Sequence, residues 1–133
     1  MKKNITNLFI IFLLLALTQA LKAQCTKEDI KTPSSWGSAE QLEASKTLLI
    51  ETKNVRELKL SLYTPKGTKI FESTSSILSP SKDVMKILDT GWDGTKLGEK
   101  LNAGFYVYTI EAECADRSTT VFKTGQIVLT IKT

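Results

Sequence analysis

The sequence RELKLSLY, residues 56–63, carries the clearest structural pattern in the chain. Leu58, Leu60 and Leu62 alternate with polar residues, so every second side chain is apolar. This period of two is typical of a strand that buries one face and exposes the other to solvent, as in antiparallel sheets. We therefore predict a half-buried strand at residues 56–63.

The residues that follow this strand predict a hairpin. The turn sequence TPKG, residues 64–67, contains a proline that presets φ and a glycine that supplies a positive φ. Residues 68–72 then provide a return strand whose apolar side chains are Ile70 and Phe71. The stretch 56–72 is therefore expected to fold as two paired strands.

Further strand patterns occur on both sides of this hairpin. They cover residues 48–55, a short edge strand at 84–88 after a serine-rich connection at 73–81, and two long strands at 105–114 and 119–132. Gly125 interrupts the last strand and predicts a bulge or bend. Residues 38–46 favour a short surface helix that begins Ser-x-x-Gln and has Leu42 as its one large apolar residue. We expect an all-β sandwich at residues 47–133, preceded by a polar leader at 24–46.

The sequence GWDGTKLGEKLNAGFYVY, residues 91–108, is the most informative part of the chain. Asp93 and Gly94 form a tight-turn pair, because Asp bonds the local backbone and Gly adopts a left-handed conformation. Trp92 is large enough to anchor this turn on the sandwich. Gly98 permits a second turn, and Gly104 lets the chain enter the aromatic strand. We expect Trp92, Asp93, Gly94, Thr95, Gly98 and Gly104 to act as a structural turn motif.

This ordered series resembles the gliding-motility-associated C-terminal domain, which is the type B sorting domain of type IX secretion. The matching residues are Trp92, Asp93, Gly94, Thr95, Gly98, Leu101, Ala103, Gly104, Tyr106, Tyr108, Gly125, Ile127 and Leu129. The resemblance extends over residues 48–132. It implies an antiparallel immunoglobulin-like β-sandwich of about seven strands, with the outer-membrane secretion machinery as partner.

The chain departs from that family in three respects. The hairpin turn keeps only Gly67 of the family's Asn-Arg-Trp-Gly sequence. The region that would match the family's acidic loop, residues 32–40, has Glu40 as its one acid, so no calcium site is expected. In the family, this domain normally follows a large cargo domain, whereas here it follows only a signal peptide. A sorting role is therefore an inference about the ancestry of this chain more than about its present use.

The first 23 residues read as a cleaved secretory signal peptide. Lys2 and Lys3 precede an apolar run at residues 8–17, and the small residue Ala23 marks the expected cleavage point. A competing interpretation makes Cys25 a lipidated residue, but Gln24 stands where that processing requires a small residue. We expect an exported protein in the periplasm, at the cell surface or outside the cell, without a membrane span after cleavage.

Signal removal changes the charge balance of the chain. The whole sequence has 18 basic and 14 acidic residues, and three of the lysines lie within the first 23 residues. The remaining chain therefore carries 15 basic and 14 acidic residues, a net charge of +1. Nucleic-acid binding needs a concentrated basic face, and this sequence offers none.

The two cysteines, Cys25 and Cys114, allow two interpretations. In an exported chain, a pair of cysteines favours a disulfide, which here would tie the N-terminal segment to the long strand at 105–114. The alternative is one buried thiol and one loose terminal thiol. We favour the disulfide, because an exposed free thiol is a chemical liability outside the cell.

The sequence argues against an enzyme. It contains no His, which removes the commonest general base and metal ligand. Asp93 fits a turn better than a catalytic role, and Glu111 and Glu113 fit a solvated strand face. We expect no catalytic residue, no metal and no cofactor.

The aromatic residues raise the question of a binding surface. Tyr106, Tyr108 and Trp36 are candidates for an aromatic contact surface, for instance for a polysaccharide, although burial as core or loop anchors is the simpler interpretation for the tyrosines. Trp36, in a polar segment, either packs over the sandwich end or contacts another protein. Two functions follow: a module recognised by an export apparatus at the outer membrane, or a free-standing module that binds a protein or polysaccharide.

Overall fold

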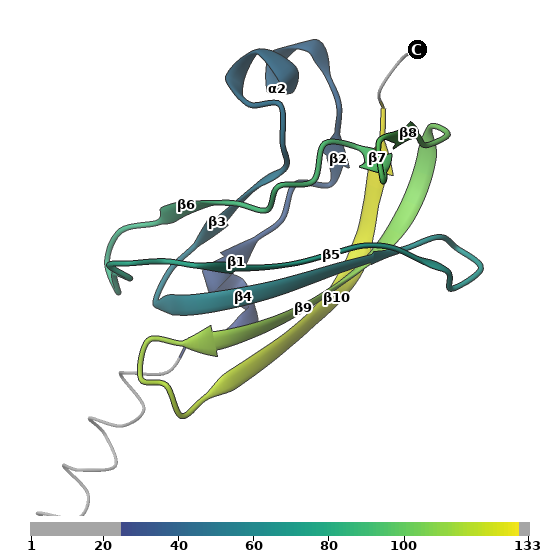
Figure 1. The fold of residues 1–133 in the computed structure, drawn as a ribbon. Helices are drawn as coiled ribbons and strands as arrows, with labels where there is room; N and C mark the ends of the chain where they lie inside the picture. The colour runs from purple at the N-terminus through teal and green to yellow at the C-terminus, as the bar shows by residue number, and fades with distance from the viewer. Residues whose placement is uncertain (1–24, 131–133) are drawn as a thin grey trace, which may run out of the picture.

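The computed structural model describes residues 25–130, which form a two-layered β-sandwich (Figure 1). The expected signal peptide, residues 1–23, lies outside the described residues. In chain order the elements are η1 (Lys27–Asp29), β1 (Ile30–Lys31), β2 (Ser35–Trp36), α2 (Ala39–Ala44), β3 (Leu49–Thr52), β4 (Val55–Tyr63), β5 (Lys69–Ser76), β6 (Lys86–Asp89), β7 (Thr95–Lys96), β8 (Glu99–Lys100), β9 (Gly104–Cys114) and β10 (Thr120–Leu129).

One layer is a five-stranded sheet with the order β2-β10-β9-β4-β5, and the other is a three-stranded sheet with the order β1-β3-β6. The strands β7 and β8 form a separate hairpin. All pairs are antiparallel except β2, which runs parallel to β10. The expected all-β sandwich is therefore confirmed. The described part contains six strands of four or more residues, together with four strands of two residues.

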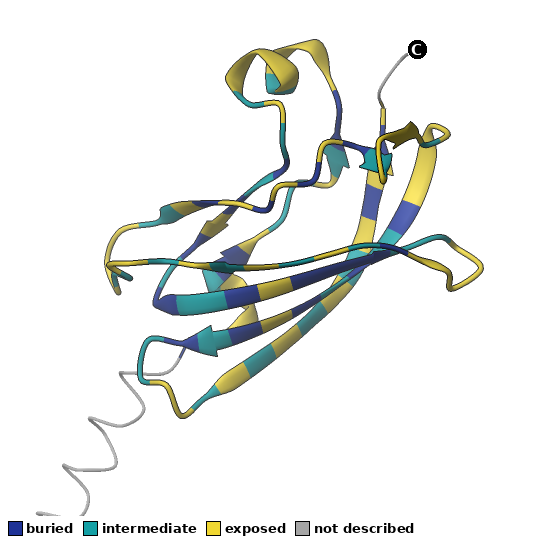
Figure 2. Ribbon diagram, in the orientation of Figure 1, coloured by how far each residue is buried: buried dark blue, intermediate teal, exposed yellow. Residues whose placement is uncertain are grey.

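The core lies between the two sheets. Along the long strands, buried residues alternate with exposed or half-buried ones (Figure 2). The three leucines that define β4 are at most 1% exposed, and they face Ile110 and Tyr108 of the neighbouring strand β9. From the three-stranded sheet, Ile50 and Leu88 are register partners that point inward. The alternation at residues 56–63 thus buries one face as predicted.

The boundaries of several expected elements differ from the structure. The expected strand at 48–55 divides at Lys53–Asn54, because Asn54 adopts a positive φ of 58° and turns the chain from β3 into β4. Half of the serine-rich connection belongs to β5, which extends to Ser76. Ser73 and Ser75 donate hydrogen bonds from their hydroxyls to the backbone carbonyls of Thr90 and Asp89. Serine on the inner side of this edge strand therefore links the two sheets.

Gly125 does not form a bulge. The pairing of β9 with β10 continues through Gly125 without a register shift, and its partner is Tyr108. A Cβ atom at this position would lie 2.5 Å from the Tyr108 hydroxyl oxygen. Glycine is present because the Tyr108 ring lies directly over the backbone at this position.

The N-terminal segment is part of the sandwich and not a separate leader. Residues 30–31 add β1 to one sheet, and residues 35–36 add β2 to the other. The backbone carbonyl of Trp36 also accepts hydrogen bonds from the amide and hydroxyl of Thr130. The expected boundary between residues 46 and 47 therefore does not separate a leader from the domain, because both sheets need residues on its N-terminal side.

Candidate functional site

The expected turn motif lies at one end of the sandwich, where it is held from the inside by Trp92. This side chain is fully buried, its ring centroid is 6.5 Å from that of Phe71, and its indole N–H donates to the Thr95 carbonyl at 3.2 Å. One carboxylate oxygen of Asp93 accepts hydrogen bonds from the Thr95 amide and hydroxyl at 3.0 and 2.6 Å. Gly94 has a φ of 86°. Asp93 therefore closes a turn here.

Gly98 and Gly104 also adopt positive φ values, of 84° and 146°. Gly98 ends the tip of the β7–β8 hairpin, and Gly104 begins β9. The six residues of the expected motif thus shape one connection, residues 91–104, between the two sheets.

The three aromatic residues expected as a contact surface lie inside the molecule. Trp36 is 3% exposed, and Tyr106 and Tyr108 are each 7% exposed. The tyrosines alternate along β9 with the exposed Phe105 and with half-buried residues, and they point toward the core. The Tyr106 hydroxyl donates to the Asn102 carbonyl at 2.7 Å. These residues therefore do not form a surface platform. Of the two interpretations of Trp36, packing on the sandwich is the one that the structure shows.

The expected disulfide is present between Cys25 and Cys114. It joins the N-terminal segment to the last residue of β9, and both residues are buried. Because the Cys25 Sγ atom is bonded to Cys114, it cannot also carry a lipid thioether. The lipoprotein interpretation of Cys25 is therefore incompatible with this structure.

The acidic side chains singled out in the sequence do not form a reactive centre. Glu113 forms an ion pair with Arg56, whose guanidinium also lies 3.5 Å from Glu57. No group of three or more Cys, Asp or Glu side chains in residues 25–130 has an arrangement that could hold a metal ion. Among the hollows on the surface of the described residues, a groove beside α2 has a largely apolar lining.

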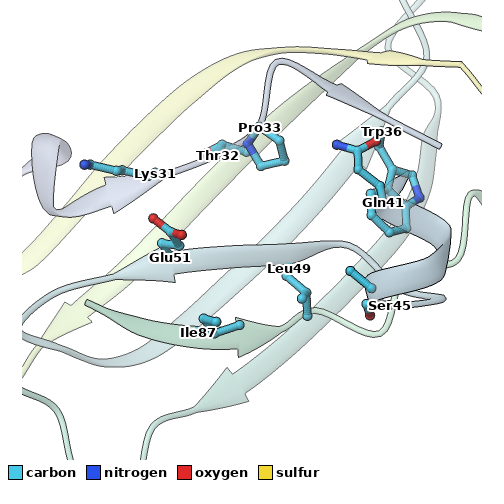
Figure 3. Close-up of a pocket in the computed structure, with 10 residues that line it drawn as sticks. Lys31, Thr32, Pro33, Trp36, Gln41, Ser45, Leu49, Glu51 and Ile87 are labelled. Atoms are coloured by element: carbon cyan, nitrogen blue, oxygen red, sulfur yellow. The ribbon is translucent and has the colours of Figure 1, made fainter. Parts of the chain in front are cut away.

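This feature, called the α2 groove below, has a volume of about 340 Å³ and lies on the outer face of the three-stranded sheet (Figure 3). Leu49, Glu51 and Ile87 of β3 and β6 lie along one side of it. Across from them lie Pro33 and Trp36, as Figure 3 shows. Further lining residues are Lys31, Thr32 and, from α2 and its C-terminal end, Gln41, Ala44 and Ser45.

The side of the groove formed by α2 is fixed by its capping residues. Ser38 accepts a hydrogen bond from the Gln41 amide, and the Gln41 side-chain oxygen accepts from the amides of Gly37 and Ser38. The Gln41 side-chain amide also donates to the Ser35 carbonyl at 2.9 Å. This capping box stabilises a helix too short to be stable alone and ties it to β2. The groove is therefore preformed.

The polar groups of the groove lie at its margin or behind its surface. Lys31 and Glu51 are exposed register partners of opposite charge on β1 and β3. The indole nitrogen of Trp36 and the hydroxyl of Thr32 are buried and, among the described residues, have no hydrogen-bond partner. The accessible lining is consequently apolar, with one positive and one negative charge at its rim.

The α2 groove is not predicted by any pattern in the sequence. Its residues come from five segments between positions 31 and 87, and no short motif joins them. The signal that was available was Trp36 with Pro33, two bulky residues in an otherwise polar stretch. Their partners on β3 and β6 are visible only after the strands are paired.

Comparisons with known proteins add little to this description. No family model and no curated protein sequence matches the chain. Among solved structures, the chain is similar to CopC from Methylosinus trichosporium OB3b, with 13% sequence identity, 79% of this chain and 92% of that chain covered, and a TM-score of 0.46. This similarity is too low to assign a function of CopC to this chain. The described residues contain no helix that is long and apolar enough to span a membrane.

Proposed function

We propose that this chain is an exported, non-catalytic binding module and that the α2 groove is its binding site. The observation that carries the proposal is a preformed apolar groove on an otherwise polar sheet face. Binding sites of this kind are concave, largely apolar and flanked by a few polar groups. Of the groups considered for chemistry in the sequence, Glu113 forms an ion pair, Asp93 closes a turn and the two cysteines form a disulfide.

The size of the groove favours a small apolar group as its ligand. Its volume of about 340 Å³ lies at the lower end of the range for small-molecule sites, about 300 to 1,000 Å³. Leu49 and Ile87, on the sheet side of the groove and called its floor below, are aliphatic, and Ile87 is 68% exposed. We infer that the groove accepts a branched aliphatic side chain presented by a protein partner.

Export is part of the proposal. The disulfide supports it, because such bonds persist in oxidising compartments such as the bacterial periplasm or the cell exterior. A polysaccharide ligand has less support, since the three aromatic side chains expected to stack against sugars are buried.

The experiment that tests the groove is a titration followed by two-dimensional NMR. N-acetyl-leucinamide is expected to shift the amide signals of Ala44, Leu49 and Ile87 and the indole signal of Trp36, whereas N-acetyl-serinamide is not. Ile87→Glu, which places a charge on the groove floor, should abolish the shifts. Val84→Glu is the matched control, because Val84 is also exposed but does not line the groove.

The proposal fails if N-acetyl-leucinamide causes no shifts, or if the shifts lie elsewhere on the molecule. It also fails if the Val84→Glu and Ile87→Glu variants lose binding equally. In that case the response would reflect net charge and not occupation of the groove.

A second candidate function is recognition by an outer-membrane secretion machinery. The observation that favours it is the rigid turn at Trp92–Thr95, the same segment on which the resemblance to type IX sorting domains rests. A reporter fused in front of residues 24–133, behind a signal peptide, should reach the cell surface in a type IX-competent host. The fusion must retain residues 24–46, because β1, β2 and Cys25 belong to the fold. Retention of the reporter in the periplasm would exclude this function.

A further inference from the structure

The tip of the β7–β8 hairpin has an unusual local conformation. Its two central residues, Leu97 and Gly98, have φ values of 50° and 84°. Two-residue hairpin turns with positive φ at both positions strongly prefer Asn or Asp followed by Gly, because other side chains are strained in the left-handed region. Leucine is therefore an unfavourable residue at position 97.

Within residues 25–130, burial of the Leu97 side chain does not offset this strain. Leu97 is 97% exposed, so a large apolar side chain projects into solvent from the tip. The base of the hairpin is nevertheless firmly held, because Thr95 pairs with Lys100 and its carbonyl accepts from the buried Trp92 indole. The hairpin thus presents one leucine on a fixed support, which we call the Leu97 finger.

The Leu97 finger and the α2 groove have complementary properties. The groove is an apolar depression with Lys31 and Glu51 at its rim. The finger is an apolar projection flanked by Lys96 and Glu99, which are register partners. Each surface therefore offers one positive and one negative charge beside its apolar centre. No residue of the hairpin lines the groove of its own chain, so one molecule leaves both surfaces unused.

We propose that the Leu97 finger of one copy inserts into the α2 groove of a second copy. This inference rests on the proposed function of the groove as a binding site. The contact is not reciprocal. The finger of the first copy occupies the groove of the second, while the groove of the first copy and the finger of the second stay free. Such a heterologous contact adds copies head to tail and does not stop at a closed dimer, unless the rotation between copies closes a ring.

The test is sedimentation analysis of the full mature chain over a range of protein concentrations. The sedimentation coefficient of the wild-type protein should rise with concentration. Leu97→Asn should weaken association about tenfold or more, the loss expected when one buried leucine side chain is removed from a contact. The same variant should be at least as heat-resistant as the parent, because Asn tolerates a positive φ.

Leu78→Asn provides the matched control. Leu78 is 100% exposed, but it has no positive φ and does not line the α2 groove. If association depends on the finger, Leu78→Asn leaves it unchanged. Equal losses in the two variants would overturn the proposal and assign the effect to general surface hydrophobicity.

A mixing experiment tests the head-to-tail geometry. Leu97→Asn has an intact groove without a finger, and Ile87→Glu has an intact finger without a groove. Each variant alone should be monomeric at a concentration at which the wild type has just begun to associate. At that concentration, an equimolar mixture should form a dimer that grows no further. A mixture that stays monomeric would overturn the proposal.

The outcomes also separate this inference from the proposed function. A wild-type chain that remains monomeric up to millimolar concentration, yet binds N-acetyl-leucinamide in the groove, would overturn the inference alone. A groove that binds neither the probe nor a second copy would overturn both. Leu97-dependent binding of a monomeric chain to vesicles of phosphatidylethanolamine and phosphatidylglycerol would assign the finger to a lipid surface and overturn the inference.

Discussion

At the scale of single residues, the pair formed by Gly125 and Tyr108 illustrates how a long-range contact selects a residue type. Gly125 reads as a break in an otherwise regular strand, but the pairing through it is regular. The three atoms nearest to a Cβ built there all belong to the Tyr108 side chain, at 2.5 to 2.8 Å. The glycine therefore reflects the size of its neighbour on β9 and not a distortion of β10.

Gly125→Ala should destabilise the protein by about 1–3 kcal/mol, because a methyl group would overlap the ring of a side chain that is itself buried. Denaturant unfolding monitored by circular dichroism measures this free energy. Combining Gly125→Ala with Tyr108→Val should cost less than the sum of the two single substitutions, since the smaller side chain removes the overlap. Strictly additive effects would contradict the steric explanation.

At the scale of elements, the β4–β5 hairpin is held by an ion network on its outer face. Glu72 lies 2.6 Å from the Lys69 ammonium and 3.1 Å from that of Lys59. The hydrogen bond from Lys69, followed by the hydrogen bond and charge of Lys59 and then the charge of Lys69, lowers the pKa of Glu72 below its usual value. The contact with Glu72 raises the pKa of Lys69.

These pKa shifts predict how the hairpin responds to pH. The pKa of Glu72 is lower in the folded state, so its stabilising contribution is present above about pH 4.5, the usual value, and is lost as the pH falls through the lowered value. The Lys69 contribution is lost only as the pH rises above 10.5 and through its raised pKa. The difference in thermal midpoint between wild type and Glu72→Gln should be small, because the groups are exposed, and should shrink below pH 4.5 and in 1 M salt. A difference that does not change with pH would contradict this assignment.

The elements also show what the sequence can and cannot predict. The alternation at Leu58–Leu62 and the aromatic strand that became β9 were predictable, because each buries every second residue along several successive positions. Two-residue strands such as β2 have no detectable period, and their existence depends on β10, more than ninety positions later. The alternation of Tyr106 and Tyr108 predicted that the two side chains share one face of their strand. It did not predict whether that face is buried. The α2 groove combines residues from five segments and could not be predicted.

At the scale of the whole molecule, the disulfide closes most of the domain into one loop. Cys25 and Cys114 are 89 positions apart, and a loop of this length contributes about 4 kcal/mol by restricting the unfolded chain. The bond also attaches η1 and β1 to the end of β9. In addition, the side-chain ammonium of Lys123 on β10 donates to the Ile30 carbonyl. The N-terminal segment is thus held covalently and by hydrogen bonds.

The double substitution Cys25→Ser and Cys114→Ser should lower the free energy of unfolding by about 4 kcal/mol, measured by denaturant unfolding. Thiol titration provides the control, since no thiol should react in the denatured wild-type protein before reduction and two should react after it. Two reactive thiols in the denatured, unreduced protein would show that the bond does not form. An unchanged unfolding free energy would show that the bond does not restrict the chain as proposed.

The parallel pairing of β2 with β10 determines when folding can finish. Ser35 and Trp36 lie beside Val128 and Leu129, so a strand from the beginning of the domain is completed by one from its end. A chain that emerges amino end first from a ribosome cannot close the five-stranded sheet until β10 has appeared. Contacts between such distant positions also form slowly, because a long loop must be closed before they are made. Local pairs such as β4 with β5 can form early, whereas the edge formed by β2 is the last part of the five-stranded sheet to gain its partner.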